Sequence, residues 1–314
     1  MHMLHNPCYF WGLLLWLSFS VDTAISQTKQ ITAPLTQQIE LRHDNDFFLL
    51  TDKYYTSGLF LTYRKRLEKG LFQNSHEQIA LSLSQEVFTP SQTQSANSSN
   101  FDRPYAGFTG FTFSWSTAGE HQLFQINMAL GLAGPNSGAG GFQRWYHRLI
   151  AISDSPLWTD ELADSFHANL YTNYVKEWEL VPVPFGVRFA FKPNLALGTR
   201  DIYIEPEAIF YFGRRNETNK TIAYDQLGST DREIYFALHF SYRRVFYNGL
   251  IEGNLFGDDS IFTTEAENAL YRLGVDFFHR YGRNNYKLGI RYNSTESPLA
   301  KNHKYVLLAY GLSF

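Results

Sequence analysis

The chain has 314 residues and a formal net charge of −3, with 17% aromatic and only 18% charged residues. This balance argues against a nucleic-acid-binding protein, which would need a strongly basic surface. The high aromatic content and low charge are instead typical of a β-sheet protein with a large apolar outer surface.

The N-terminal segment has the pattern of a secretory signal peptide. Residues 10–19 (FWGLLLWLSF) form an apolar core that is too short to cross a bilayer as a helix. Residues 24–26 (AIS) then offer small side chains at the spacing of a signal-peptidase site. We therefore predict a signal peptide over residues 1–26 and one mature domain over residues 27–314. The single cysteine, Cys8, lies in the predicted signal, so we expect no disulfide in the mature chain.

The remaining chain alternates apolar and polar residues in runs of about ten, as transmembrane β-strands do. The last run is the clearest, with an apolar residue at every second position of 306–314 and Phe314 at its end. Apolar alternation that ends on aromatics is what a lipid-facing barrel strand requires. A carboxy-terminal Phe also resembles the assembly signal of bacterial outer-membrane barrels.

We predict an all-β fold, a closed antiparallel transmembrane β-barrel of about 12 strands, because an open sheet edge cannot be satisfied in lipid. The predicted strands are residues 36–47, 54–66, 77–88, 106–118, 121–133, 166–178, 184–196, 201–213, 232–246, 267–280, 284–293 and 303–314. A soluble sandwich or a lipocalin-like barrel is the alternative. The predicted signal peptide, the aromatic content and the terminal Phe argue against it.

The parity of the strands predicts which connections lie outside. With a periplasmic N-terminus, the odd-numbered connections lie outside, and those at 89–105, 134–165 and 248–266 are long and polar. Residues 214–231 break this rule, because they form a long connection on the inner side. Either a strand is split wrongly there or one inner loop is unusually large.

The first candidate site residues lie in residues 42–58 (RHDNDFFLLTDKYYTSG). Asp and Asn are poor strand residues, so Asp44, Asn45 and Asp46 in a row at the end of a strand suggest a chemical role. Strict alternation places Asp46 and Thr56 inside the barrel near its outer rim. It points Asn45 outward, unless a bulge changes the direction of that side chain.

The second candidate site residues lie in the fifth connection. A glycine-rich segment precedes residues 142–152 (FQRWYHRLIAI), whose spacing predicts a short helix. Gln143 and His147 are four residues apart and share one face of that helix. Folded into the barrel mouth, the helix would bring both side chains against Asp46 and Thr56.

These residue types suit metal-assisted ester hydrolysis without a covalent intermediate. A histidine in a polar niche, here His147, can take a proton from water near neutral pH. Asp46 and Asn45 offer hard oxygen ligands, which favour calcium over zinc, and a bound cation can polarise an ester carbonyl. Thr56 could orient the water or the carbonyl. Each residue also has a plain structural interpretation, since a lone histidine on a loop helix is more often a packed or surface residue.

Four sequence blocks resemble the lipid A 3'-O-deacylase (LpxR-like) family of outer-membrane barrels. In chain order they are residues 44–48 (DNDFF), 54–59 (YYTSGL), 102–107 (DRPYAG), and 134–135 (GP) leading to Q-x-x-x-H-R at 143–148. The resemblance implies a barrel enzyme that removes the 3'-linked acyloxyacyl group of lipid A with calcium and a histidine-activated water.

The resemblance also implies a role for each candidate. It makes His147 the general base and places Asn45 and Asp46 in the metal and oxyanion region. Thr56 and Gln143 complete the site.

Two departures from the family pattern concern the surroundings of this site. Family members carry an acidic residue shortly after the histidine, where this chain has Ser153 with Asp154 beside it. Some also carry a lysine for lipid A phosphate after the third strand, whereas residues 92–100 have no basic residue and Arg103 is the nearest. Arg103 and Tyr55 are therefore the candidate substrate contacts.

We expect a calcium-dependent carboxylic ester hydrolase that acts on lipid A or lipopolysaccharide, as a monomer in the bacterial outer membrane. Two alternatives stay open. One is a phospholipase on the same barrel, and the other is a catalytically silent barrel that serves as a pore or a structural protein.

Overall fold

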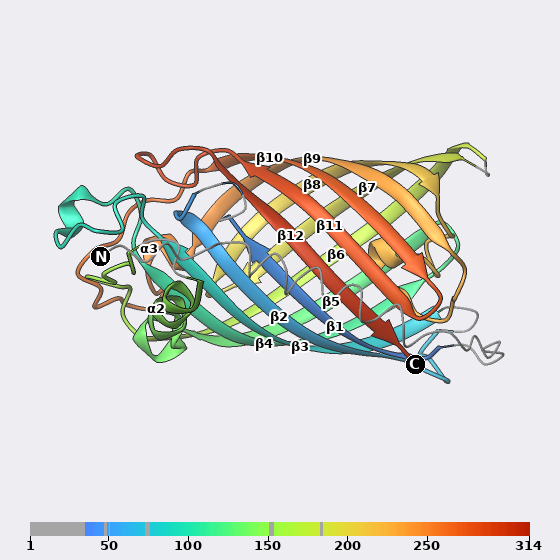
Figure 1. Ribbon diagram of the computed structural model, residues 1–314, viewed down its shortest axis with the longest axis horizontal. Coiled ribbons are helices and arrows are strands. Elements are labelled where there is room, and N and C mark those ends of the chain that lie inside the picture. Colours follow the sequence, from blue (N-terminus) through green and yellow to red (C-terminus); the bar gives the residue numbers. More distant parts are fainter. Residues whose placement is uncertain (1–34, 47–48, 50, 73–75, 151–153, 183–184) are drawn as a thin grey trace, which may run out of the picture.

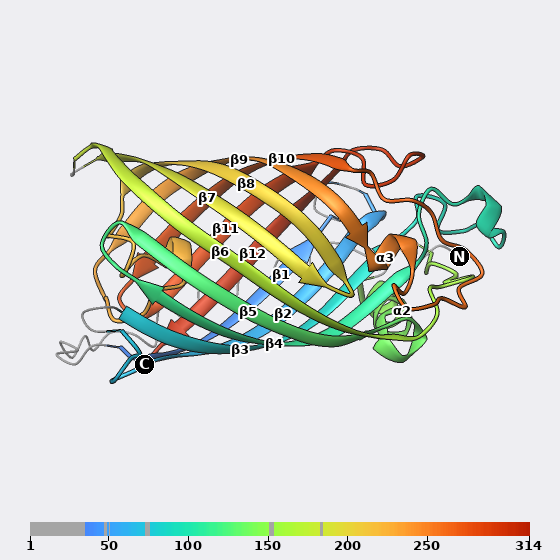
Figure 2. The same ribbon diagram turned by 180° about the vertical axis from the view of Figure 1, so that it is seen from behind.

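The computed structural model describes residues 35–46, 49, 51–72, 76–150, 154–182 and 185–314, so the predicted signal peptide lies outside the described residues. Within them, consecutive strands pair in antiparallel fashion from β1 to β12, and β12 closes on β1. Figures 1 and 2 show the resulting barrel from its two sides. The prediction of a closed antiparallel barrel of twelve strands is confirmed. Among the described residues, no helix has the length and apolarity needed to cross a bilayer.

Each strand lies within a few residues of its predicted range. The strands are β1 (Gln37–Asn45), β2 (Tyr54–Arg66), β3 (His76–Thr89), β4 (Ala106–Ala118), β5 (Gln122–Ala133), β6 (Ser165–Val181), β7 (Gly186–Gly198), β8 (Asp201–Arg214), β9 (Glu233–Asn248), β10 (Ala269–Tyr281), β11 (Asn284–Asn293) and β12 (His303–Ser313). The helical elements are η2 (Ser98–Asn100), η3 (Pro135–Ser137), α2 (Ala139–Ile150), η4 (Ile222–Tyr224) and α3 (Gly249–Glu252).

Side-chain alternation separates a lipid-facing surface from a polar lumen, as predicted. In β1, Leu41 is 51% exposed on the outside, whereas its neighbour Glu40 is 5% exposed and turned inward. In β2, Leu61 is exposed and Thr62 is buried in the same way. The outward apolar residues form the band that a bilayer requires.

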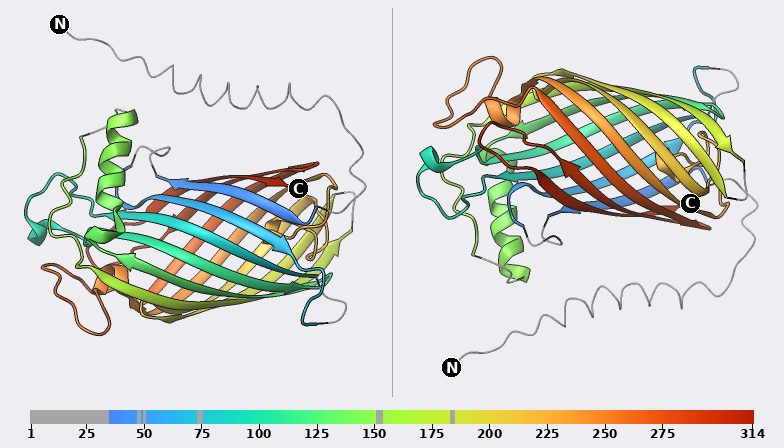
Figure 3. Two further views of the ribbon diagram at one scale, coloured as in Figure 1. Left: turned by 90° about the horizontal axis from the view of Figure 1, so that it is seen from below. Right: turned by 90° about the horizontal axis from the view of Figure 1, so that it is seen from above.

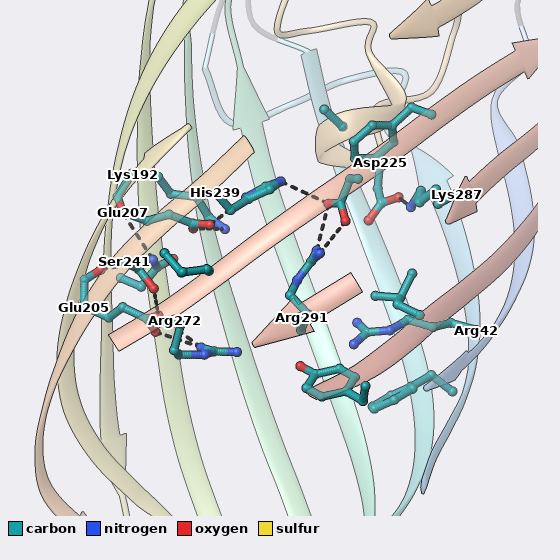
Figure 4. A pocket seen from close by; sticks show the side chains of 18 of the residues that line it. Arg42, Lys192, Glu205, Glu207, Asp225, His239, Ser241, Arg272, Lys287 and Arg291 are labelled. Carbon is teal, nitrogen blue, oxygen red and sulfur yellow. Dashed lines mark hydrogen bonds and ion pairs between the residues drawn. The ribbon is translucent and has the colours of Figure 1, made fainter. Parts of the chain in front are cut away.

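Ion pairs between nearby strands line the lumen. Glu205 on β8 lies 3.0 Å from Arg272 on β10. His239 on β9 lies between Glu207 on β8 and Asp276 on β10, at 2.8 and 3.0 Å. Figure 4 shows Glu205, Glu207, His239 and Arg272 around a polar cavity. Asp276 also lines this cavity, whose volume is about 490 Å³. Because each charge has a partner on another strand, the network ties the wall together from inside.

We call the barrel end that carries the β1–β2 and β5–β6 connections the outer end, and the opposite end the inner end. The β8–β9 connection lies at the inner end and folds back into the barrel (Figure 1). Its Arg215 pairs with Glu177 of β6 at 2.6 Å, and its Asp225 pairs with Arg64 of β2 at 3.1 Å. Ile222 between them is buried. The long inner connection at 214–231 is therefore a genuine large loop, and no strand was split wrongly there.

The helix α2 lies at the outer rim, against the outward side of β3 and β4 (Figure 3). Phe88 of β3 lines the lumen, so its neighbour Val87 points outward by alternation. Val87 packs with Ala139 at the start of α2 and with Trp158 after it. On the lipid-facing side of β1, His43 contacts the ring of Tyr146 from α2, with 6.1 Å between ring centroids. The predicted helix thus covers the wall at the mouth.

Candidate active site

A bulge in β2 sets the direction of the side chains at the site. The register of β2 with β3 shifts between Tyr55 and Ser57. Tyr55 points into the lumen, where its hydroxyl donates to Asp44 at 2.9 Å, whereas Thr56 faces α2. The prediction that Thr56 points into the barrel is wrong, because the inserted residue interrupts the alternation on which it was based. Asn45 pairs with Ser57 across the hairpin and is buried.

Gln143 of α2 lies directly over the hairpin. Its Nε2 is 3.5 Å from Thr56 Oγ1, and its Oε1 accepts a hydrogen bond from Trp158 Nε1 at 2.8 Å. The bond from Trp158 fixes the orientation of the amide, so the NH2 group is turned toward the hairpin. Both Gln143 and His147 are buried, although the face of α2 beside them is exposed.

Asp52 joins α2 to the hairpin, and the sequence reasoning missed it. One carboxylate oxygen accepts a hydrogen bond from Gln143 Nε2 at 3.2 Å, and the other lies 3.5 Å from His147 Nε2. Burial raises the pKa of the Asp52 carboxyl, while the nearby His147 works in the opposite direction. An acidic residue in a short loop is ordinary turn chemistry, so nothing in its local sequence marks it.

Asp46 is a buried carboxylate held by its own loop. Its Oδ2 accepts hydrogen bonds from Thr51 Oγ1 at 2.8 Å and from the Lys53 backbone N–H at 3.0 Å. Its backbone N–H donates to the carbonyl oxygen of Thr56 at 3.3 Å. Burial, together with the negative charge of Asp52, raises the pKa of Asp46 to about 8. None of the ion pairs formed within the described part of the chain includes Asp46.

Within the described residues, the buried Asp46 carboxylate has no cationic partner, which fits a bound divalent cation. Asp46 and Asn45 both present oxygen, the ligand atom that calcium prefers. The described residues contain no cluster of three or more His, Cys, Asp or Glu side chains suited to a metal. Amide and backbone carbonyl oxygens and water would therefore supply the rest of a calcium shell. The donor chemistry fits calcium and does not fit zinc.

The two predicted substrate contacts lie away from this site. Arg103 is only 1% exposed, and its guanidinium pairs with Glu296 at 3.0 Å. Tyr55 lines the lumen on the other side of the wall. Of the two residues nearest to the family's acidic position, Ser153 lies outside the described residues and Asp154 is exposed.

The remaining faces of α2 are suited to a lipid boundary. Trp145 and Leu149, four residues apart, are exposed apolar side chains. Arg144 and Arg148, also four residues apart, are exposed beside them. Exposed apolar and basic rows on one helix are typical of helices that lie in the membrane interface. The site between α2 and the wall therefore lies on the lipid-facing side of the barrel and not in the lumen.

A comparison with protein families shows which family the chain belongs to. The family described as outer membrane protein LpxR matches residues 13–313. The chain belongs to the LpxR family. The predicted resemblance is confirmed, and so is the predicted place in the outer membrane.

One solved structure agrees with this LpxR-family fold. LpxR from Salmonella typhimurium matches with a TM-score of 0.74 at 17% sequence identity, over 88% of this chain and 100% of that chain. At this sequence identity, the structural similarity shows a shared fold and nothing further. The beta domain of the Bordetella autotransporter Brka matches with a TM-score of 0.45 at 8% identity, over 90% of this chain and 99% of that chain. A search of curated proteins found no match.

Proposed function

We propose that the protein is an outer-membrane esterase that hydrolyses the 3'-linked acyloxyacyl chain of lipid A, with calcium and a water activated by His147. Membership of the LpxR family supports a role in lipid A modification. The observation that carries the chemistry is the buried His147, whose Nε2 lies 3.5 Å from Asp52 at the lipid-facing side of the wall.

The position of the site suits a substrate held in the outer leaflet. α2 rests on the outward side of the wall, so an acyl chain can approach along the apolar surface formed by residues such as Leu41 and Leu61. Trp145 and Leu149 extend that surface beyond the strands. A polar headgroup would then lie at the level of the rim.

The residues of this site can perform hydrolysis of an ester. His147 takes a proton from water, whose oxygen bonds to the acyl carbon, and returns the proton to the sugar alcohol when the ester C–O bond breaks. The NH2 group of Gln143, oriented by Trp158, can donate to the polar groups of the ester. Calcium, when held by Asp46 and Asn45, supplies positive charge that stabilises the oxyanion. Thr56 lies close enough to Gln143 to position the same groups.

The mass profile of lipid A tests this proposal. Cells that express the protein should lose the acyloxyacyl group from lipid A and keep their phospholipids unchanged. His147→Ala should lower the rate about 100-fold or more, as the loss of a general base does. His121→Ala, which changes an exposed histidine, is the matched control and should retain full activity. Calcium chelation should remove the activity, and added calcium should restore it.

Two results would contradict the proposal. Loss of acyl chains from phospholipids with lipid A intact would indicate a phospholipase. Unchanged lipids in cells with the folded parent protein would indicate a catalytically silent barrel.

A further inference from the structure

We propose that Asp52 is the positioning residue for His147, and that its single carboxylate holds the imidazole and the Gln143 amide in register over the hairpin. The catalytic meaning of this assignment rests on the function proposed above. The structural part, that Asp52 ties α2 to the β1–β2 hairpin, stands on the contacts alone.

The two carboxylate oxygens of Asp52 serve different partners. Oδ1 accepts a hydrogen bond from Gln143 Nε2 at 3.2 Å, and Oδ2 lies 3.5 Å from His147 Nε2. Gln143 and His147 are one helical turn apart, so one carboxylate contacts two successive turns of the same helix face. The hairpin and the helix are thereby fixed against one another at the point where the reaction would occur.

Asp52 is the acid of this hairpin that reaches His147. The Asp46 carboxylate is turned toward its own loop, where it accepts hydrogen bonds from Thr51 and Lys53. Asp154, which follows α2 in the chain, is exposed. We infer that the two carboxylates have different roles: Asp46 would bind the cation, and Asp52 would position the imidazole of His147.

A carboxylate beside an imidazole has two known effects on a general base. It holds the ring in one orientation and tautomer, and it stabilises the imidazolium that forms when the base takes a proton. Both effects act on the rate of the chemical step more than on substrate binding. Removing the charge of Asp52 should therefore change kcat, with little effect on KM.

The experiment compares Asp52→Asn, Asp52→Glu and Asp154→Asn in the purified full-length protein, with purified lipid A as substrate. Asp52→Asn should lower kcat about 10- to 1,000-fold and leave KM and the calcium concentration for half activation within about twofold. Asp52→Glu should recover part of the rate, because it restores a carboxylate. Asp154→Asn is the matched control and should behave as the parent. In a His147→Ala background, Asp52→Asn should have no further effect, since both residues act as one unit.

Hydrogen exchange of α2 provides a readout that needs no activity. Asp52→Asn should speed exchange at residues 139–150 several-fold and leave the strands unchanged. If the parent is inactive on lipid A, the proposed function fails, and this measurement still decides the positioning role. Parent-like kcat and parent-like exchange in Asp52→Asn would overturn the inference. So would a loss of activity that saturating calcium restores, because Asp52 would then be a calcium ligand.

Discussion

The partly buried side chain of Glu161 makes the stability of the contact region between α2 and the wall depend on pH. It lies close to Gly107 of β4, and its Oε1 is buried without a hydrogen-bond partner in the described part of the chain. Burial raises the pKa of Glu161 from 4.5 to about 7, with a further contribution from Asp164 and opposing effects of the Gly107 N–H and Arg144. The folded protein thus favours the neutral carboxyl. The contribution of the neutral Glu161 carboxyl to the free energy of unfolding is complete below pH 4.5. It is lost as the pH rises through the folded-state pKa of about 7.

Glu161→Gln should therefore stabilise the protein only where the parent residue is ionised. Because Glu161 is partly exposed, we expect a gain of about 1–2 kcal/mol at pH 8 and none at pH 4. That gain corresponds to a rise of about 2–8 °C in the unfolding midpoint. Unfolding in detergent, followed by the mobility change of the heated barrel on gels, measures it at both pH values. An equal shift at both would show that ionisation of Glu161 is not the cause.

At the scale of the element, α2 is held on the wall by close contact at one glycine. A Cβ atom at Gly107 would overlap Ser137 Oγ and Ala139 Cβ, so even alanine would push the start of α2 away from β4. Displacing the helix would move Gln143 and His147 from the hairpin without breaking any strand pairing. The strands and the site therefore respond separately to a substitution at this position.

Gly107→Ala should lower the proposed esterase activity about tenfold or more while the barrel remains folded, because small displacements of the groups assigned to catalysis would be costly. Gly119→Ala is the matched control, since the nearest atom to its new Cβ would be Gln122 Cγ at 3.6 Å. Activity on lipid A and gel mobility, measured for both variants, distinguish displacement of α2 from unfolding of the barrel. Full activity in Gly107→Ala would mean that the start of α2 does not need this contact.

The elements that could be predicted from sequence are those whose residue types repeat at a regular spacing, every second residue in a strand or every third to fourth residue in a helix. Alternation predicted the strands, and the four-residue spacing of Gln143 and His147 predicted the face of α2 that packs against the hairpin. The direction of Thr56 could not be predicted, because one inserted residue at the bulge reverses it without any change in composition. Asp52 could not be predicted either, since its partner Gln143 is 91 residues away and a loop has no period.

At the scale of the whole molecule, the barrel keeps the candidate site at one end apart from the large loop at the other end. The candidate site lies at the outer end, and the β8–β9 loop fills the inner end. That loop is anchored by Arg215, which pairs with Glu177 at 2.6 Å and lies over the ring of Tyr211 at 4.2 Å. Both charged side chains are almost completely buried. Without Arg215, the buried Glu177 carboxylate would keep only Arg188, at 3.7 Å, as a cationic partner within the described residues. Losing most of the compensation of a buried charge is far more costly than losing an exposed pair.

Arg215→Met should therefore destabilise the barrel by about 3 kcal/mol, while leaving the proposed esterase activity at moderate temperature unchanged. Adding Glu177→Gln should recover part of the loss, because it removes the uncompensated charge. Lys220→Met is the matched control in the same loop. Its pair with Glu217 is 44% and 41% exposed, so its loss should change stability by less than about 1 kcal/mol. Unfolding midpoints and activity on lipid A, measured on the same samples, test the independence of the two ends. A fall in activity of Arg215→Met without a fall in its unfolding midpoint would show that the inner loop and the outer site are coupled through the lumen.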